Sequence, residues 1–301
     1  MFWRKRDKTI RRTGVFCSAA GLATATVRRD ADGKASVESC VFNESGATDP
    51  RAALTRMFDG NANRRGRFSA VLANGSYHLL LTDAPEVADD ELRAAIRWKL
   101  ADLVPFPVAD AVVDVFDVPA RARRGTSSSV YVVATQKSVV QDHAHVMERF
   151  GERYDVLDVP EMCLRNLAAL LPDGDQGLAM VHVEQQHAHI VVLRQGTIYL
   201  ARQIELTAMD REQNTDAVVL ELQRSLDYFE SHHDQRPVKR TLVSAVSDAV
   251  SADELITAIG PRAEALDIVG HLALDPGTEP AAIDRNLLAL GAALRVEQAA
   301  A

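Results

Sequence analysis

Residues 14–42, GVFCSAAGLATATVRRDADGKASVESCVF, and residues 177–206, GLAMVHVEQQHAHIVVLRQGTIYLARQIEL, decide the fold of this chain. Each stretch predicts a β-hairpin, a glycine turn and a third strand, because runs rich in Val, Ile, Ala and Thr flank turns that carry Gly33 and Gly196. A three-stranded unit that recurs after roughly half the chain suggests two related subdomains facing each other across a cleft.

Helices and strands alternate in the rest of the chain. An acidic start at 88–91 opens an amphipathic helix whose inward stripe is Leu92, Ile96, Leu100 and Leu103, and Pro105 ends it. The other predicted helices are at 49–57, 137–150, 160–171, 214–231, 252–259 and 283–294, and the other predicted strands at 68–73, 77–81, 111–118, 130–135, 154–159, 241–246 and 266–269. This order predicts a two-lobed α/β protein with its main boundary near Pro160.

Composition narrows the class of protein. The chain has 301 residues, of which 47% are hydrophobic and 25% charged, and this is typical of a folded protein with two domains. Its net charge of −8 argues against nucleic acid as a partner, because binding phosphates needs clustered Lys and Arg. The three cysteines are scattered, with no C-x-x-C pair, so neither a disulfide framework nor a zinc ribbon is indicated.

The sequence contains no run of 18 apolar residues, and the segment MFWRKRDKTIRR lacks the apolar core of a signal peptide. We therefore expect a cytoplasmic protein. Phe2 and Trp3 stand beside several Arg and Lys residues, so this segment could rest against an anionic membrane face. A solvated basic tail is the interpretation that we favour.

Three segments suggest a family. The segment IRWKLADLVPFP at 96–107 resembles a helix ending in a Pro-Phe pair in PilM proteins, LELQRSLDYFESHH at 220–233 resembles their long second-lobe helix, and LLALGAALR at 287–295 is similar to their closing helix. The resemblance spans nearly the whole chain and is strongest to the MshI branch, which serves mannose-sensitive haemagglutinin (MSHA) type IV pili. It extends to the cytoplasmic domain of the GspL secretion proteins.

The resemblance implies an α/β, actin-like fold, that is, a ribonuclease H-like duplicated βββαβα fold of two lobes with an inserted cap subdomain. The implied parts are a basic tail at 1–12, a first lobe at 13–159 that includes a cap at about 84–136, and a second lobe at 160–301 whose closing helix returns to the first lobe.

The resemblance also implies a function. PilM proteins act at the cytoplasmic face of the inner membrane as scaffolds of the pilus machine, and bind the amino-terminal tail of a PilN-like inner-membrane protein in a groove beside the cap. The assembly ATPase and the platform protein are further possible partners. The apolar candidates for this groove are Trp98, Val104, Pro105 and Phe106, for which simple packing within the cap is the equally weighted alternative.

The chain departs from nucleotide-binding members at the positions where ATP would bind. In the first hairpin the family's Asp, Gly and Lys fall on Phe16, Ser18 and Ala23, and in the second hairpin the Asp and Gly fall on His182 and Glu184. Magnesium and phosphates need oxygen ligands, a close backbone and a cation, and a glutamate beside phosphates repels them. We therefore expect no cofactor and no enzymatic activity, and the alternative is an ATP-binding member whose nucleotide state controls the groove.

A metal site is a further alternative. If Gln185 and Gln186 form a tight turn, Glu184 pairs with His187 and His182 with His189, and the four side chains share one face of the sheet. Three imidazoles and a carboxylate could hold zinc. Because polar residues commonly occupy strand ends, and because neither glutamine is usual in a tight turn, we favour no metal.

Overall fold

The computed structural model describes residues 10–44, 66–119, 129–172, 176–207, 210–233 and 235–296. The helix predicted at 49–57, the tail residues Phe2 and Trp3 and most of the polar segment 121–129 lie outside these ranges. The chain divides into two compact units, which are unit 1 (residues 1–72, 146–172 and 267–301) and unit 2 (residues 73–145 and 173–266). The lobe and cap limits expected from the sequence remain predictions.

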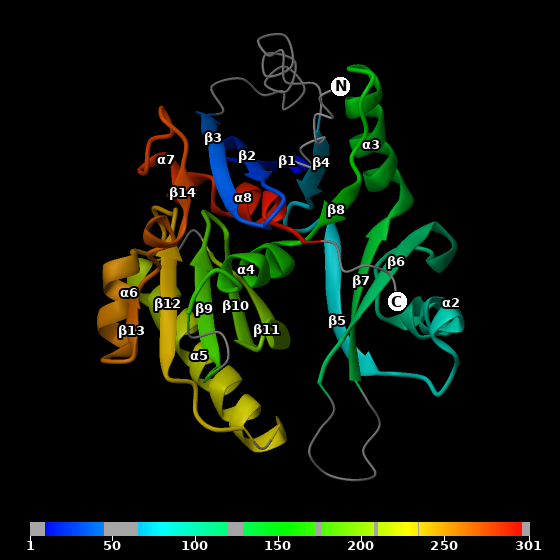
Figure 1. Ribbon diagram of the computed structural model, residues 1–301. Helices are drawn as coiled ribbons and strands as arrows, with labels where there is room; N and C mark the ends of the chain where they lie inside the picture. The colour runs from blue at the N-terminus through cyan, green and yellow to red at the C-terminus, as the bar shows by residue number, and fades with distance from the viewer. Residues whose placement is uncertain are drawn as a thin grey trace, which may run out of the picture. The chain divides into compact units, whose positions relative to one another are not determined.

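Unit 1 is built on a six-stranded mixed sheet in the order β14-β3-β2-β1-β4-β8 (Figure 1). The strands are β1 (Ile10–Ser18), β2 (Gly21–Arg29), β3 (Ala35–Glu44), β4 (Arg67–Val71), β8 (Val156–Asp158) and β14 (Ala273–Leu274). The first three are antiparallel, whereas β4 runs parallel to β1. The first predicted three-stranded unit is thus confirmed, with Gly33 in the turn at φ +82°.

Helix α8 (Leu287–Ala293) packs on this sheet, and every one of its residues is buried. The close approach needs glycine on the sheet, because a β-carbon at Gly14 would overlap with the carbonyl of Ala289. Glycine is equally required on the helix, since a β-carbon at Gly291 would lie 2.5 Å from the carbonyl oxygen of Cys163 in α4 (Pro160–Ala168).

The continuous helix predicted at 283–294 is wrong, because the helix breaks at Asn286 into α7 (Ala282–Arg285) and α8. Asn286 is fully buried. Its Oδ1 accepts a hydrogen bond from the backbone N–H of Thr24 (3.0 Å), and its Nδ2 donates to the carbonyl of Ala282 (2.6 Å). The side chain thereby satisfies the N–H of Thr24 and, at the break, the carbonyl to which the backbone N–H of Asn286 would donate in a continuous helix.

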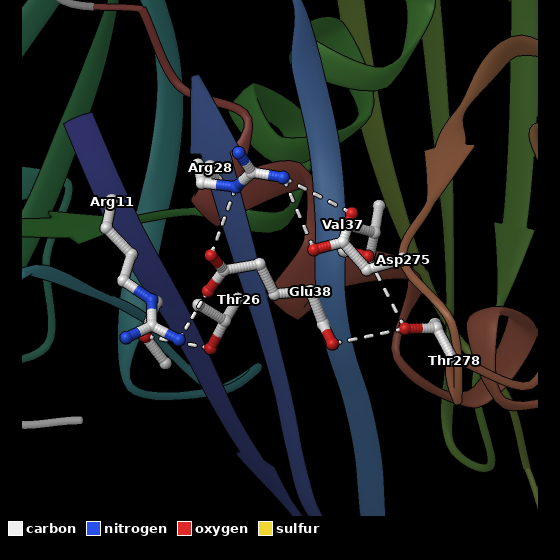
Figure 2. A network of polar contacts seen from close by, with 8 residues as sticks. Arg11, Thr26, Arg28, Val37, Glu38, Asp275 and Thr278 are labelled. Carbon is white, nitrogen blue, oxygen red and sulfur yellow. Dashed lines mark hydrogen bonds and ion pairs between the residues drawn. The ribbon is translucent and has the colours of Figure 1, made fainter. Parts of the chain in front are cut away.

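A chain of ion pairs runs across β1, β2 and β3 to the segment that follows β14 (Figure 2). Arg11 and Arg28 both pair with Glu38, and Arg28 also pairs with Asp275 at 3.4 Å. The Thr278 hydroxyl donates to the carbonyl of Glu38 (3.2 Å). These contacts hold the segment after β14 against the first hairpin and β3.

Unit 2 contains a five-stranded sheet in the order β11-β10-β9-β12-β13. Its strands are β9 (Leu178–Val183), β10 (His187–Arg194), β11 (Thr197–Glu205), β12 (Arg240–Ala245) and β13 (Ala263–Ala265), and its helices are α5 (Arg211–His233) and α6 (Ala252–Ile259). All of β9 is buried, in a core that includes Leu222 and Phe229 of α5. The second predicted three-stranded unit is therefore also confirmed.

Unit 2 also contains a three-stranded antiparallel sheet, β5-β7-β6, whose strands are β5 (Tyr77–Asp83), β6 (Ala111–Asp117) and β7 (Ser129–Gln136). Helix α2 (Asp89–Lys99) packs on it, followed by 3-10 helices at Leu100–Asp102 and Val108–Asp110 (Figure 1). We call residues 77–136 the cap. Helix α3 (Lys137–Glu148) follows β7.

Two details of the prediction are wrong. The stripe residue Leu103 is half exposed, because α2 ends at Lys99 and the chain tightens into a 3-10 turn that directs Leu103 away from the core. The strand predicted at 266–269 lies earlier, at Ala263–Ala265, and Val269–His271 forms a 3-10 helix.

Replacing Gly14 by alanine should destabilise the protein by about 3 kcal/mol, because α8 must move off β1 to admit the methyl group. Urea unfolding measures this loss. The matched control is Gly270→Ala, where the three atoms nearest to the new methyl all belong to the Asp267 side chain, the closest at 3.2 Å, so the change should cost little. Equal stability of the two variants would contradict the packing argument.

Candidate functional site

The first hairpin places Phe16 and Ala23 opposite each other on β1 and β2, and both are buried. Phe16 also lies beside Val71 of β4. Ser18 lies at the end of β1, where its hydroxyl accepts a hydrogen bond from the N–H of Ala20 (3.3 Å). These positions therefore offer a phenyl ring, a methyl group and a hydroxyl engaged in its own turn, and none of them is a cation or a carboxylate.

The second hairpin has the register that the sequence predicted. His182 and His189 are direct partners on β9 and β10, and the N–H of Glu184 donates to the carbonyl of His187 (2.8 Å). Both His182 and His189 are buried. The hairpin thus brings two buried imidazoles and a carboxylate together.

A polar network surrounds these groups within unit 2. His182 Nδ1 shares a hydrogen bond with the Ser244 hydroxyl on β12 (2.9 Å), and His189 Nε2 lies 3.8 Å from Glu184 Oε2. Asn74 Nδ2 donates to Glu184 Oε2 (3.0 Å), and Gln203 Nε2 donates to Asn74 Oδ1 (2.8 Å). The network therefore joins β9, β10, β11 and β12 with the residues that precede β5. Sequence reasoning missed the roles of Asn74 and Gln203, which no motif marks.

The network sets the charge of its members. Burial lowers the pKa of His182 to about 4, with the charge of His189 acting in the same direction and Glu184 opposing it. Burial raises the pKa of Glu184, but the neighbouring imidazole of His189 and those of His182 and His187 outweigh this and lower it overall. At neutral pH the site therefore holds a neutral His182 beside a carboxylate, and this carboxylate would repel phosphates.

The same contacts bear on the zinc alternative. His182 is bonded to Ser244, and Glu184 is bonded to Asn74. In the part of the chain that the structure describes, no group of three or more His, Cys, Asp or Glu side chains is arranged to hold a metal ion. The four residues of the alternative, including His187, are thus not brought together as a ligand set.

The four apolar residues expected to line the peptide groove include both core and surface residues. Val104 belongs to the core between α2 and the three-stranded sheet, together with residues such as Ile96 and Val132. Phe106 is half-buried against this core, with its ring 5.8 Å from that of His78. Pro105 is exposed, and Trp98 is 85% exposed. Packing within the cap therefore accounts for Val104 and leaves Trp98 unexplained.

Trp98 is one of several apolar side chains that the cap exposes. The described residues contain nine exposed large apolar side chains, and five of them lie in the cap: Leu81, Val87, Trp98, Leu103 and Val112. Sequence reasoning identified only Trp98, because it placed Leu103 in the inward stripe of the helix and no motif marks Leu81, Val87 or Val112. We refer to these five residues as the exposed cap residues.

Comparison with solved structures defines the class of fold. A structure described as "PilM-PilN type IV pilus biogenesis complex" has a TM-score of 0.73 at 19% identity and covers 94% of this chain and 97% of that one. The cytoplasmic domain of EpsL, an inner membrane component of the type II secretion system of Vibrio cholerae, has a TM-score of 0.53 at 13% identity, with 87% and 92% covered. The chain thus has the actin-like α/β fold that the duplicated hairpins and the resemblance predicted.

Sequence comparison then matches part of the chain to a family. Residues 80–223 match the sequence model of a family described as "Type IV pilus assembly protein PilM". The five exposed cap residues all lie within the matched segment. No curated protein matches the sequence. Among the described helices, none combines the length and the apolar character needed to cross a membrane.

The buried His182 predicts a defined pH dependence of stability. Its pKa is about 4 when folded and near 6.5 when unfolded, so the unfolded chain binds more protons between these values. The free energy of unfolding should therefore fall by about 2 kcal/mol from pH 7 to pH 5. Urea unfolding at both pH values checks this.

His182→Asn keeps a hydrogen-bonding group near Ser244 and removes the titration, so its stability should change less over the same interval. Glu184, whose pKa is lowered, contributes its own loss only below its unfolded value of 4.5. A variant that loses as much stability as the parent would show that other groups cause the effect.

Proposed function

We propose that this protein is a non-enzymatic scaffold of a type IV pilus assembly platform, which binds the amino-terminal tail of a PilN-like inner-membrane protein. The observation that carries the proposal is that residues 80–223 match the PilM family and include all five exposed cap residues. The structure of similar fold that is described as a PilM-PilN complex supports the choice of partner.

The cap offers what an extended peptide needs. In the described part of the chain, β5 and β6 each pair only with β7 within the three-stranded sheet, so each presents a strand edge. Main-chain hydrogen bonds at such an edge supply affinity, and apolar pockets beside it supply specificity. Leu81 lies on β5 and Val112 on β6. Between them in the sequence, Trp98 lies on α2 and Leu103 in the turn after it.

Side chains of α2 already bind the main chain near these edges. Arg97 donates to the carbonyl of Ala111 at the start of β6 (2.8 Å), and Lys99 donates to the carbonyl of Asp83 at the end of β5 (3.0 Å). These bonds fix α2 at both outer strands of the sheet. A peptide would therefore meet a preorganised surface, which lowers the entropic cost of binding.

We also propose that the protein neither binds nor hydrolyses ATP. Phe16 and Ala23 are packed in the interior, and Glu184 is held as a carboxylate by Asn74 and His189. A protein that binds the tail of an inner-membrane partner would work at the cytoplasmic face of that membrane. The finer assignment to an MSHA-type pilus follows from the resemblance to the MshI branch.

The second candidate function is that of an ATP-binding protein whose nucleotide state controls partner binding. The buried polar network around His182 and Ser244 favours it, because nitrogen and oxygen groups gather at the second hairpin. The same experiment tests both candidates.

We expect ATP with Mg²⁺ to leave the melting temperature unchanged, and a synthetic peptide of the PilN-like tail to raise it. Ligand binding stabilises a folded protein by mass action, so a peptide at 100 times its Kd should add about 2.7 kcal/mol. Differential scanning calorimetry measures both effects. A nucleotide-dependent shift that is lost on changing Ser18 or Glu184 would reverse the choice between the two candidates.

Trp98→Ala should weaken peptide binding about tenfold or more and leave the free energy of unfolding within about 0.5 kcal/mol, because the side chain is 85% exposed. Phe106→Ala should lower binding more than stability. Val104→Ala should instead destabilise the cap by about 1 to 2 kcal/mol, because it removes core volume.

Val41→Ala is the matched surface control, since Val41 is exposed on β3 of unit 1 and should affect neither property. Calorimetric peptide titration and urea unfolding give the two readouts. Unchanged peptide affinity in both the Trp98 and Phe106 variants would move the binding surface away from this part of the cap.

A further inference from the structure

A hollow with a volume of about 290 Å³ lies within unit 2, between α5, the end of α6 and the start of β12. Three polar side chains line it, and they belong to Gln223, Thr241 and Arg262. A mostly apolar hollow with few polar groups is the usual composition of a small-molecule site. The apolar part of the described lining consists of Val219, Leu222, Leu226, Val238, Ile259 and Pro261.

The different lengths of the two helices produce this hollow. Both helices lie beside β12 (Figure 1), and both contribute to the core that contains Val243 of that strand. Helix α6 has 8 residues and ends at Gly260, whose φ of +95° turns the chain toward β13. Helix α5 has 23 residues and continues beyond Leu226, its last described lining residue. Where α6 stops, Thr241 is left on the helix-covered face of β12, because it lies two residues from Val243.

Thr241 and Arg262 present polar groups to the hollow from neighbouring positions. The N–H of Thr241 donates to the carbonyl of Arg262 (2.8 Å), which holds the two residues together. Thr241 is 2% exposed, and its hydroxyl bonds to none of the residues that the structure describes. The guanidinium of Arg262 likewise forms no hydrogen bond or ion pair within the described ranges. Because a buried hydroxyl without a partner is costly, these two groups indicate a place for ligand oxygens.

Neither the end of α6 nor a nearby carboxylate accounts for Arg262. A cation after the last turn of a helix commonly bonds the final carbonyls, but the Arg262 side chain bonds no carbonyl in the described part of the chain. Glu264, two residues later, pairs with Arg240 instead. None of the described lining residues is acidic. The hollow therefore combines one positive charge and one hydroxyl with an apolar space.

We propose that this hollow binds a fatty acid of about eight carbons, with its carboxylate at Arg262 and Thr241 and its chain along the apolar residues of α5. A guanidinium donates two parallel hydrogen bonds to a carboxylate, and a hydroxyl can donate a third. The single charge of a carboxylate matches the single charge of Arg262, whereas a phosphate monoester would bring nearly two.

The volume of the hollow supports a ligand of this size. If each non-hydrogen atom takes about the 30 Å³ of a water molecule in the liquid, the hollow holds about ten such atoms. Octanoate has this size. An α-helix with its side chains is about 10–12 Å across, and even a peptide of two leucines has more atoms than the hollow holds. A small amphipathic acid is therefore favoured over a segment of polypeptide.

Calorimetric titration of the full chain with octanoate, in about 0.1 M salt, is the first test. The parent should bind octanoate, and it should bind octylammonium at least about tenfold more weakly, because that ligand places a cation beside Arg262. Octanoate should also bind at least about fivefold more tightly than hexanoate, since it buries two more methylene groups. No binding of octanoate, or equal affinities for octanoate and octylammonium, overturns the proposal.

Two variants test the residues that would hold the carboxylate. Arg262→Gln should bind octanoate at least about tenfold more weakly but octanol within about twofold of the parent, because octanol carries no charge. Thr241→Val removes the hydroxyl and nearly keeps the shape, and it should bind octanoate about threefold more weakly.

Arg236→Gln is the matched control, because it removes the same charge from an exposed position of unit 2 outside the described lining. It should bind octanoate within about twofold of the parent. Arg262 is also exposed, so both arginine variants should fold, and urea unfolding verifies this. Parent-like octanoate affinity in folded Arg262→Gln, or an equal loss in Arg236→Gln, contradicts the site.

A last titration distinguishes a fatty acid from the carboxyl end of a polypeptide. Acetyl-leucyl-leucine carries the same carboxylate on a larger body, so it should bind more weakly than octanoate. Binding of this peptide at least about tenfold tighter than that of octanoate, and lost in Arg262→Gln, would overturn the fatty acid as the occupant. The hollow shares no residue with the exposed cap residues, so neither result depends on the proposed binding of a PilN-like tail.

Discussion

Unit 1 depends on the direct contact between α8 and β1. The backbone of Gly14 faces the carbonyl of Ala289, and Gly291 lies against the backbone of α4 on the opposite side of the helix. Every residue of this helix is buried, and a side chain at either glycine would push the helix away from its neighbour. The contact joins residues about 275 positions apart in the sequence, which makes the sheet and the late helices one core.

The position of α8 also determines which polar contacts form in unit 1. Asn286 can reach the N–H of Thr24 only because α8 begins there, and Arg29 can reach the carbonyl of Leu294 only because α8 ends there. At the same end, Arg12 and Arg67 of the adjacent strands β1 and β4 line a hollow together with residues that follow α8. The close packing of one apolar helix therefore also determines where the charged groups of this unit gather.

The sequence predicted the two three-stranded units well, because alternating apolar strands and glycine turns are local signals. Even the pairing of His182 with His189 followed from the assumed turn at Gln185 and Gln186. The failures have a different origin. The break at Asn286 depends on a partner 262 residues away, and the exposure of Leu103 depends on where α2 stops, which helical periodicity does not reveal.

The exposed cap residues offer apolar surface and strand edges, whose contribution to binding changes little with ionic strength. They belong to unit 2, whereas the contact between α8 and β1 belongs to unit 1, and the two sets share no side chain. Substitutions of the exposed cap residues can therefore change partner binding without removing the contact on which unit 1 depends.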